Sequence, residues 1–436
     1  MVRSVPAVLA ETHRAIDAVW RIESPRLIAG LTRIVRDVGV AEDLAQDALV
    51  AALEQWPTSR IPRNPGAWLM AAAKHRAIDY FRRNKLLERK HEELGYELRT
   101  GRDAAESTSE AALDDEVGDD LLRLVFTACH PVLSTEARVA LTLRLLGGLT
   151  TSEIARAFLV PESTIAQRIV RAKRTLAEKQ VPFEVPRGPE LAARLSSVLE
   201  VVYLIFNEGY LATTGDDWMR PALCDEALRL GRILAQLAPM EAEVHGLVAL
   251  MEIQASRSRA RTGPSGEPIL LLDQNRALWD RLLISRGLAA LERAEKLTDA
   301  RGRYTLQAAI AACHARAVTP EATDWMRIAA LYDQLAAVER SPVVELNRAV
   351  AVGMAFGPQA GLDLVETLKR QPALENYHWL PSVRGDLLNK LGRHDEARAE
   401  FERAASLTRN TRERDLLLQR AAKIDAKVGR GHEKRI

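Results

Sequence analysis

The chain has 436 residues, with 61 lysines and arginines against 59 aspartates and glutamates, and 47% of its residues are hydrophobic. This composition is typical of a globular protein of several domains and excludes a disordered or collagen-like chain. Three well-separated cysteines predict neither a disulfide framework nor a metal site, and no apolar run approaches the ~18 residues of a membrane span. We therefore expect a protein of the reducing cytoplasm, with no metal or other cofactor and no membrane partner.

Helix-forming residues dominate throughout, and the alternating apolar pattern of strands is absent from the sequence. The predicted fold class is all-α. Breaks rich in proline, glycine or acidic residues place domain boundaries near residues 100 and 187. The predicted parts are a domain at 1–100, an acidic linker at 101–119, a second domain at 120–187 and a helical extension at 188–436.

Residues 41–56, AEDLAQDALVAALEQW, predict an amphipathic helix. Leu44, Ala48 and Ala51 fall on its apolar stripe. The polar stripe comprises Asp43, Gln46, Asp47 and Glu54. Such an acidic stripe can bind a basic partner helix, although an ordinary solvated face explains the pattern equally well.

The next predicted helix begins with Asn64 as N-cap and Pro65 in the first helical position. Its basic side chains are Lys74, His75, Arg76, Arg82 and Arg83. They are interleaved with Trp68, Tyr80 and Phe81, a combination suited to single-stranded or melting DNA, because cations bind phosphate and aromatic rings stack on bases. Residues 60–90 carry a local charge of +7 and residues 101–120 a local charge of −7. The alternative is a buried aromatic core beside a solvated basic surface.

Residues 150–176 predict a helix-turn-helix motif. Thr150 and Glu153 have capping-box spacing, so the first helix should begin near Thr151 and end at the Val160-Pro161 step. The second helix should begin at Ser163 or Thr164. Its core stripe comprises Ile165, Ile169, Ala172 and Leu176, and its opposite face comprises Gln167, Arg168, Arg171 and Arg174. Arginine and glutamine can bind base edges in a major groove, whereas an ordinary amphipathic helix is the plain alternative.

These three segments together resemble the sigma factors of bacterial RNA polymerase, specifically the extracytoplasmic-function (ECF) group. The resemblance covers about the first 180 residues, with residues 41–56 similar to the polymerase-docking helix, 65–83 to the minus-10 reader and 149–176 to the minus-35 reader. It implies core RNA polymerase and both double-stranded and melted promoter DNA as partners. One departure is His75, which stands where many members of the group carry asparagine.

The resemblance also implies roles for individual residues. Contacts with polymerase are expected from Asp43, Leu44, Gln46 and Asp47. Contacts with the minus-10 element are expected from Lys74, His75, Arg76, Asp79, Tyr80, Arg82 and Arg83. Contacts with the minus-35 element are expected from Ser163, Thr164, Gln167, Arg168, Arg171, Lys173 and Arg174.

The rest of the chain predicts a helical extension. Gly385, Ala397, Phe401 and Ala404 match the small and aromatic positions of a tetratricopeptide repeat, and the layout resembles an ECF subgroup with such an extension. Its expected role is regulatory, through an intramolecular or protein partner, although a scaffold without a ligand is the alternative. No catalytic arrangement is evident in the sequence. Glu208 is a candidate general base, but it has no partner nearby in the sequence. A tetratricopeptide-coupled one-component regulator and a plain interaction scaffold are the remaining alternatives to a sigma factor.

Overall fold

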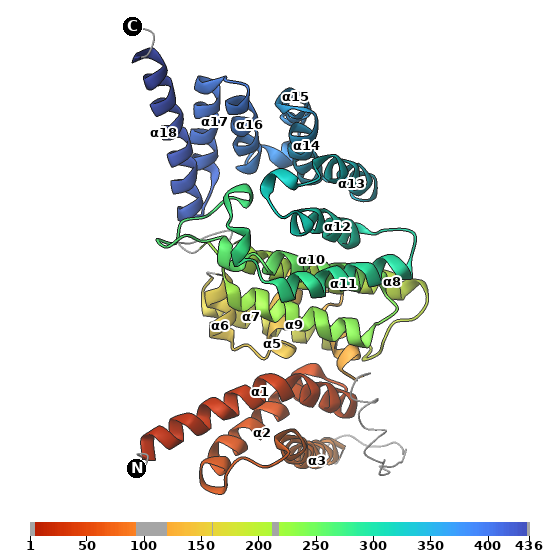
Figure 1. The fold of residues 1–436 in the computed structure, drawn as a ribbon. Helices are drawn as coiled ribbons and strands as arrows, with labels where there is room; N and C mark the ends of the chain where they lie inside the picture. The colour runs from red at the N-terminus through yellow and green to blue at the C-terminus, as the bar shows by residue number, and fades with distance from the viewer. Residues whose placement is uncertain (1–4, 93–119, 159, 212–217, 434–436) are drawn as a thin grey trace. The chain divides into compact units, whose positions relative to one another are not determined.

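The computed structural model describes residues 5–92, 120–158, 160–211 and 218–433 (Figure 1). These residues form α-helices, short 3-10 helices and loops, with an isolated β-bridge between Thr262 and Pro268 and no strand among the described residues. The all-α prediction is therefore confirmed for the described residues. The predicted acidic linker at 101–119 lies outside them.

Two compact units divide the chain, Met1–Val202 and Tyr203–Ile436. The division falls inside α8 (Pro189–Tyr210), whereas the sequence breaks place a boundary near 187. Side chains early in α8 explain the difference, because Arg194 donates to the Phe126 carbonyl oxygen at 3.0 Å and the Ser197 hydroxyl donates to that of Cys129 at 2.7 Å. The start of α8 therefore packs as part of the first unit.

The first unit contains two groups of helices before α8. They are α1 (Val5–Val35), α2 (Val38–Ser59), α3 (Pro65–Glu92), a helix over residues 120–128, α5 (Thr135–Leu145), α6 (Thr151–Phe158) and α7 (Glu162–Glu178). Helices α1, α2 and α3 pack together around Leu31, Trp56 and Leu69, and α5, α6 and α7 pack together around Leu141 and Ile165. Each of these five side chains is buried, which fixes the helix faces that remain exposed.

Capping side chains determine where α2 and α3 begin. The Asp37 carboxylate accepts a hydrogen bond from the Val40 backbone N–H at 2.9 Å, and the Asn64 side chain accepts one from Ala67 at 3.0 Å. Pro65 occupies the first position of α3, where a backbone N–H would have no partner within the helix. The predicted start of this helix is confirmed.

The second unit consists of successive helices after α8. They are α9 (Pro221–Leu237), α10 (Ala242–Ala255), η1 (Ser258–Ala260), η2 (Leu271–Asp273), η3 (Arg276–Leu278), α11 (Arg281–Leu297), α12 (Arg303–Arg316), η4 (Pro320–Ala322), α13 (Trp325–Val338), α14 (Pro342–Phe356), α15 (Pro358–Leu368), η5 (Pro372–Leu374), α16 (Trp379–Lys390), α17 (His394–Leu407) and α18 (Thr411–Glu433). Most of these helices pack against their neighbours in sequence, as α16, α17 and α18 do in Figure 1. This arrangement is typical of a helical solenoid.

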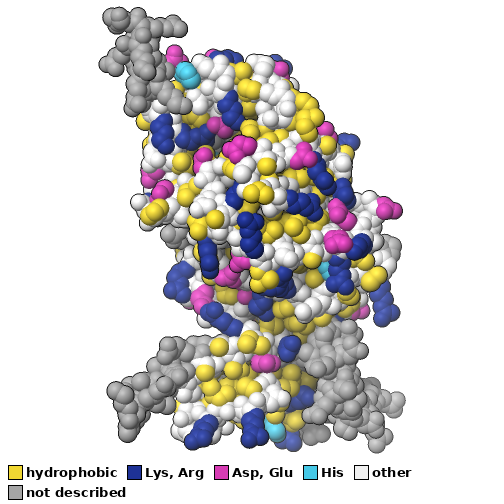
Figure 2. Space-filling model, in the orientation of Figure 1, with side chains coloured by type: hydrophobic (Ala, Val, Ile, Leu, Met, Phe, Trp, Pro, Cys, Tyr) yellow, Lys and Arg dark blue, Asp and Glu magenta, His cyan; other side chains and the backbone are white. Residues whose placement is uncertain are grey.

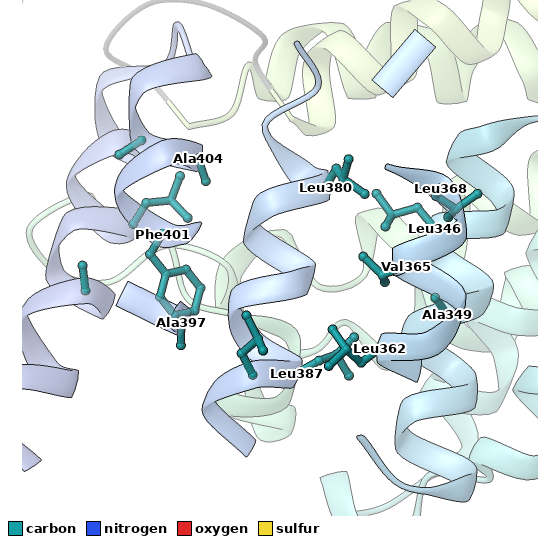
Figure 3. Close-up of a cluster of buried hydrophobic side chains, with 14 of the residues drawn as sticks. Leu346, Ala349, Leu362, Val365, Leu368, Leu380, Leu387, Ala397, Phe401 and Ala404 are labelled. Carbon is teal, nitrogen blue, oxygen red and sulfur yellow. The ribbon is translucent and has the colours of Figure 1, made fainter. Parts of the chain in front are cut away.

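A hydrophobic cluster joins helices α14 to α18, and Figure 3 shows Phe401 within it, between α16 and α17. Ala397, Phe401 and Ala404 are at most 1% exposed. A Cβ atom on Gly385 would lie 3.1 Å from Cε1 of Phe401 and 3.2 Å from the Ala397 carbonyl oxygen. Glycine therefore allows the close approach of α16 and α17, and the packing predicted from the repeat pattern is confirmed.

Candidate polymerase and DNA interface

The exposed face of α2 is partly acidic and partly apolar. Asp43 and Asp47 are exposed one helical turn apart, and Val50 and Leu53 further along the helix are 50% and 36% exposed. Leu44, expected among the polymerase contacts, is only 6% exposed and belongs to the core. The surface available to a partner on α2 therefore consists of carboxylates followed by aliphatic side chains.

Glu42, next to this face, forms a buried ionic cluster inside the first unit. Its side chain is 3% exposed and contacts Arg144 of α5 at 2.6 Å and Lys173 of α7 at 2.6 Å. Gln46 donates to the same carboxylate at 2.7 Å. Burial alone would raise the pKa of Glu42, but the Lys173 and Arg144 charges outweigh it, so the pKa lies below its ordinary value.

Two residues expected at functional surfaces are thus engaged elsewhere in this structure. Gln46 is only half-exposed and faces Glu42, and the Lys173 side chain is 20% exposed because it is held by the same carboxylate. Gln46 therefore lies only partly on the exposed face that the helical pattern predicts for it, and Lys173, expected from the resemblance alone, is held away from the minus-35 surface. The sequence gives the helix face of each residue, but a long side chain can turn toward a charge on another helix.

The outer surface of α3 combines cations with apolar side chains. Lys74 and His75 are exposed, and Ile78 and Phe81 are 50% and 42% exposed. The rings of Tyr80 and Phe81 meet edge to face, with their centroids 5.8 Å apart. Figure 2 shows basic and hydrophobic side chains side by side on the visible part of the α1–α3 group. Trp68, in contrast, packs edge to face against the buried Trp56 at 5.2 Å and so belongs largely to the core.

The remaining candidate side chains of α3 have partners on or near this surface. Arg76 lies 3.7 Å from the Asp47 carboxylate, Arg82 lies 3.9 Å from Asp79, and Arg83 donates to the Asp79 carbonyl oxygen at 3.4 Å. Arg82 and Asp79 have well-exposed side chains, so this ion pair is solvent-screened and weak. A phosphate group could therefore displace it at little cost.

Helices α6 and α7 form the predicted helix-turn-helix. The capping box is reciprocal, since the Thr150 N–H donates to Glu153 at 2.8 Å and the Glu153 N–H donates to the Thr150 hydroxyl at 3.1 Å. Burial alone would raise the pKa of Glu153, but these hydrogen bonds and the Arg21 charge lower it below its ordinary value. The start of α6 at Thr151 is confirmed, whereas α7 begins at Glu162, slightly earlier than predicted, directly after Pro161.

The face of α7 opposite its core is available to a ligand. Its buried residues are Ile165, Ile169, Ala172 and Leu176, as predicted. Ser163, Gln167, Arg171 and Arg174 are exposed, and Thr164 and Arg168 are half-exposed. Arg174 pairs with Glu178 at 2.6 Å within the helix. Val170, which is outside the expected set of DNA contacts, is 64% exposed on the same surface, where an aliphatic side chain could contact a thymine methyl group.

Other candidate chemistry is accounted for within the described residues. Cys129, Cys224 and Cys313 are buried free thiols, and burial raises the pKa of Cys129 to about 11. Glu208 forms an ion pair with Arg220, a partner that its sequence neighbours did not reveal. None of the described helices is long and apolar enough to cross a membrane, and the described residues contain no group of side chains that could hold a metal ion.

Three known families match successive stretches of the chain, and the first two stretches contain the surfaces described above. Residues 20–86 match the family described as Sigma-70 region 2, and residues 123–176 match Sigma-70, region 4. Residues 194–295 match a family of unknown function, DUF6596. The first two families contain the α2, α3 and α7 surfaces described above.

Several known proteins are similar to this chain. An uncharacterized protein of Rhizobium meliloti (strain 1021) is 43% identical over 399 residues, which cover 91% of this chain and 93% of that protein. The probable ECF RNA polymerase sigma factor SigI of Mycobacterium tuberculosis is 27% identical over 40% of this chain, and the match spans 58% of SigI. The ECF RNA polymerase sigma factor SigK of Mycobacterium ulcerans is 29% identical over 35% of this chain and 78% of SigK. With both sigma-70 regions matched and ECF factors among its relatives, this chain belongs to the ECF group of sigma factors and carries a C-terminal helical extension.

Proposed function

We propose that this protein binds core RNA polymerase through the exposed face of α2 and directs initiation at specific promoters, while its C-terminal extension modulates that activity. The observation that carries the proposal is the outward face of α7, where Gln167, Val170 and Arg171 lie opposite a fully buried stripe. This proposal places the protein in the cytoplasm with the polymerase, which supplies the catalysis.

The α2 face fits a protein partner better than a purely acidic stripe does. Asp43 and Asp47 supply charges that steer a basic surface, and Val50 supplies apolar area that a partner can bury. Leu44 supports the same helix from the core. The docking surface in this proposal therefore consists of Asp43, Asp47 and Val50, with Gln46 at its edge.

The α3 surface suits a melted strand. Lys74 and the other cations of this helix would bind phosphates, while Tyr80 and the half-exposed Phe81 offer ring faces to unstacked bases. The full set proposed for the minus-10 element is Lys74, His75, Arg76, Asp79, Tyr80, Arg82 and Arg83. Base stacking is sequence-tolerant, so specificity at this element would come mainly from hydrogen bonds by polar members of the set.

The α7 surface suits a major groove. Gln167 and Arg171 are one turn apart and exposed, which is the placement that base-edge contacts from a recognition helix require. Ser163, Thr164, Arg168 and Arg174 would bind phosphates or bases beside them. Lys173 joins them only if its ion pair with Glu42 is exchanged for a phosphate contact.

The experiment is transcription from a cognate promoter with purified core polymerase and the double variant D43K/D47K. We expect loss of polymerase binding and of transcription with little change in stability, because substitutions on exposed surfaces usually alter unfolding free energy by less than about 0.5 kcal/mol. The Asp47–Arg76 pair lost in this variant is well exposed and adds at most about 1 kcal/mol. The matched control D299K/E375K reverses two exposed acids of the second unit and should transcribe normally.

Undiminished polymerase binding by D43K/D47K would contradict the docking role. Specific promoter binding by the wild-type protein alone, with no stimulation of core polymerase, would instead identify a one-component regulator. Polymerase-bound protein without salt-dependent DNA binding would leave only an interaction scaffold.

A further inference from the structure

A cavity of about 180 Å³ lies within the second unit, next to the end of α8. Its wall includes Tyr210 and Trp218, the two arginines that flank η1 (Arg257 and Arg261), the segment before η3, and side chains of α16 and α18. Residues 210–274 of this wall fall inside the stretch that matches the family of unknown function. None of the residues proposed for polymerase or DNA contact lines the cavity.

Two buried guanidinium groups line this cavity without a carboxylate partner among the described residues. Arg257 is 9% exposed and Arg261 is 6% exposed. Arg261 donates to the Tyr210 carbonyl oxygen, and Nε of Arg257 is buried without a hydrogen-bond partner within the described part of the chain. The Tyr210 ring centroid lies 3.5 Å from Cζ of Arg261 and 5.8 Å from Cζ of Arg257. Aromatic faces offset only part of the cost of burying two positive charges.

The pKa values of groups in and near the cavity indicate that a negative charge is missing from its wall. Burial lowers the pKa of the Arg261 guanidinium below its ordinary value, and the neighbouring Arg257 charge lowers it further. Burial followed by the charges of Arg257 and Arg276 lowers the pKa of His314 to about 4. By contrast, Arg420, another residue of the wall, is paired with Asp386. The excess of positive charge therefore lies on Arg257 and Arg261.

The same cavity also has unused hydrogen-bond acceptors. Oε1 of Gln274 is buried without a hydrogen-bond partner, while its amide nitrogen donates to the Ile269 carbonyl oxygen at 3.2 Å. Oε1 of Glu413 is buried without a hydrogen-bond partner as well, although its other oxygen contacts His378 at 3.0 Å and accepts from Thr408 at 2.5 Å. A ligand that completes this site therefore needs a donor as well as a negative charge.

Size and wall chemistry define the ligand further. A cavity of about 150 Å³ holds one benzene molecule, so a cavity of 180 Å³ accommodates about one substituted ring. Tyr210, Trp218 and Trp379 provide aromatic surface for such a ring, and a planar carboxylate matches the fork of a guanidinium group. We propose that this cavity is a binding site for a small aromatic carboxylate that carries a ring hydroxyl or amino group.

Such a site would give the extension a chemical signal to respond to. Its ligand would bind whether or not the protein acts as a sigma factor, so the site is tested on the isolated full-length protein without polymerase or DNA. Failure of the transcription experiment would therefore not affect this test, and failure of this test would leave the proposed function intact.

Isothermal titration calorimetry with 4-hydroxybenzoate as the probe is the direct measurement. We expect saturable binding that is at least about tenfold tighter than that of 4-hydroxybenzamide, which has the same shape without the charge. Benzoate, which lacks the ring donor, should bind more weakly than 4-hydroxybenzoate. Inorganic phosphate at the same concentration should not compete, because it offers no ring to the aromatic wall.

Matched variants locate the binding. R257M should weaken 4-hydroxybenzoate binding by at least about tenfold, whereas R259M, an exposed arginine two residues away in η1, should bind like the wild type. R257K keeps a cation in place but loses the planar fork, and it should give an intermediate affinity. Q274M provides a second wall variant that leaves both arginines in place and should also weaken binding of the hydroxylated probe. Circular dichroism checks that each variant is folded.

Three results would overturn the assignment. The first is absence of saturable binding by the folded wild-type protein, and the second is equal binding by wild type and R257M. The third concerns Asp216 and Asp217, which lie outside the described residues. If the probe binds D216N/D217N but not the wild type, an internal carboxylate is the partner of the two arginines.

Discussion

Glu42 and Asp43 are adjacent acids on α2, yet their environments are opposite. Glu42 is 3% exposed between Arg144 and Lys173, whereas Asp43 faces solvent. Helix geometry explains the contrast, because successive side chains point about 100° apart around the axis. An acidic pair on a helix can therefore supply one residue to the interior and one to the surface. The sequence pattern placed Asp43 correctly on the exposed face but contained no signal for the two cations that surround Glu42.

Replacing Glu42 with glutamine tests the buried cluster. We expect E42Q to lower the free energy of unfolding of the first unit by about 3 kcal/mol, the lower end for a broken buried ion pair, because the Arg144 and Lys173 side chains remain 22% and 20% exposed. Urea denaturation measures the change. D43N, which removes the neighbouring exposed charge, should alter stability by less than about 0.5 kcal/mol.

The dependence of stability on pH, compared between the wild type and E42Q, tests the same cluster. The folded-state pKa of Glu42 is lowered, so its stabilisation is present above the unfolded-state pKa of glutamate and disappears as the pH falls through the folded value. Wild-type protein should therefore lose more stability on acidification than E42Q does. Parallel curves for the two proteins would contradict the lowered pKa of Glu42 in the folded state.

Arg171 gives the sharpest test on the recognition helix because it is exposed on α7. We expect R171A to weaken promoter binding by about 1–3 kcal/mol and to relax the preference at one base position of the minus-35 element. Quantitative footprinting on a set of single-base promoter variants measures both effects. R187A, in the exposed loop after the motif, is the control. A uniform loss across all sequences would instead identify Arg171 as a phosphate contact.

Among whole elements, those with local signals were predicted well. The starts of α3 and α6 and the buried stripe of α7 follow from capping residues and from helical periodicity, which act within a few residues. Exposure of Val50, Ile78 and Val170 was not predicted, because periodicity reports which residues can be buried and not how much surface the neighbouring helices cover. The division inside α8 was missed for a related reason, since Arg194 and Ser197 are fixed by contacts with residues far away in the sequence.

The capping box of α6 permits a test at the level of one helix. T150A removes the hydroxyl that accepts from the Glu153 N–H, so we expect a loss of about 1 kcal/mol in stability. Binding to minus-35 DNA should weaken with it, because α6 packs directly on α7. S152A, in the first turn of the same helix, is the control and should behave like wild type in urea denaturation and in DNA binding. Equal stability of T150A and S152A would exclude a capping role.

At the level of the whole molecule, the extension can be perturbed without touching the first unit. Phe401 is 1% exposed, and its replacement by alanine should cost about 3–5 kcal/mol, with the largest effect on α16, α17 and α18, which pack against one another in sequence order. Hydrogen exchange should show the loss of protection there. F356A, at a position 59% exposed on α14, is the matched control. Loss of protection across the first unit would contradict this local behaviour.

Removal of the extension should shift transcription in the same direction as F401A if the extension modulates initiation. The cut should follow Val202, because ending the chain near Pro186 would remove Arg194 and Ser197 and leave carbonyl groups of residues 126 and 129 without these donors. A shortened protein ending near 186 would thus confuse lost folding with lost regulation. Wild-type transcription by both F401A and the chain ending at Val202 would make the extension an inert scaffold.

The mainly local packing of the second unit also sets the order of events during synthesis. Each late helix packs against a neighbour made just before or after it, and the cluster from Leu346 to Ile424 is completed only after Ile424 has been added to the chain. The first unit ends at Val202 and leaves the ribosome earlier. At about 5–20 residues per second, translation of residues 203–436 takes about 10–50 s. Every new molecule therefore passes through a period in which its sigma regions can fold while any control by the extension has not yet begun.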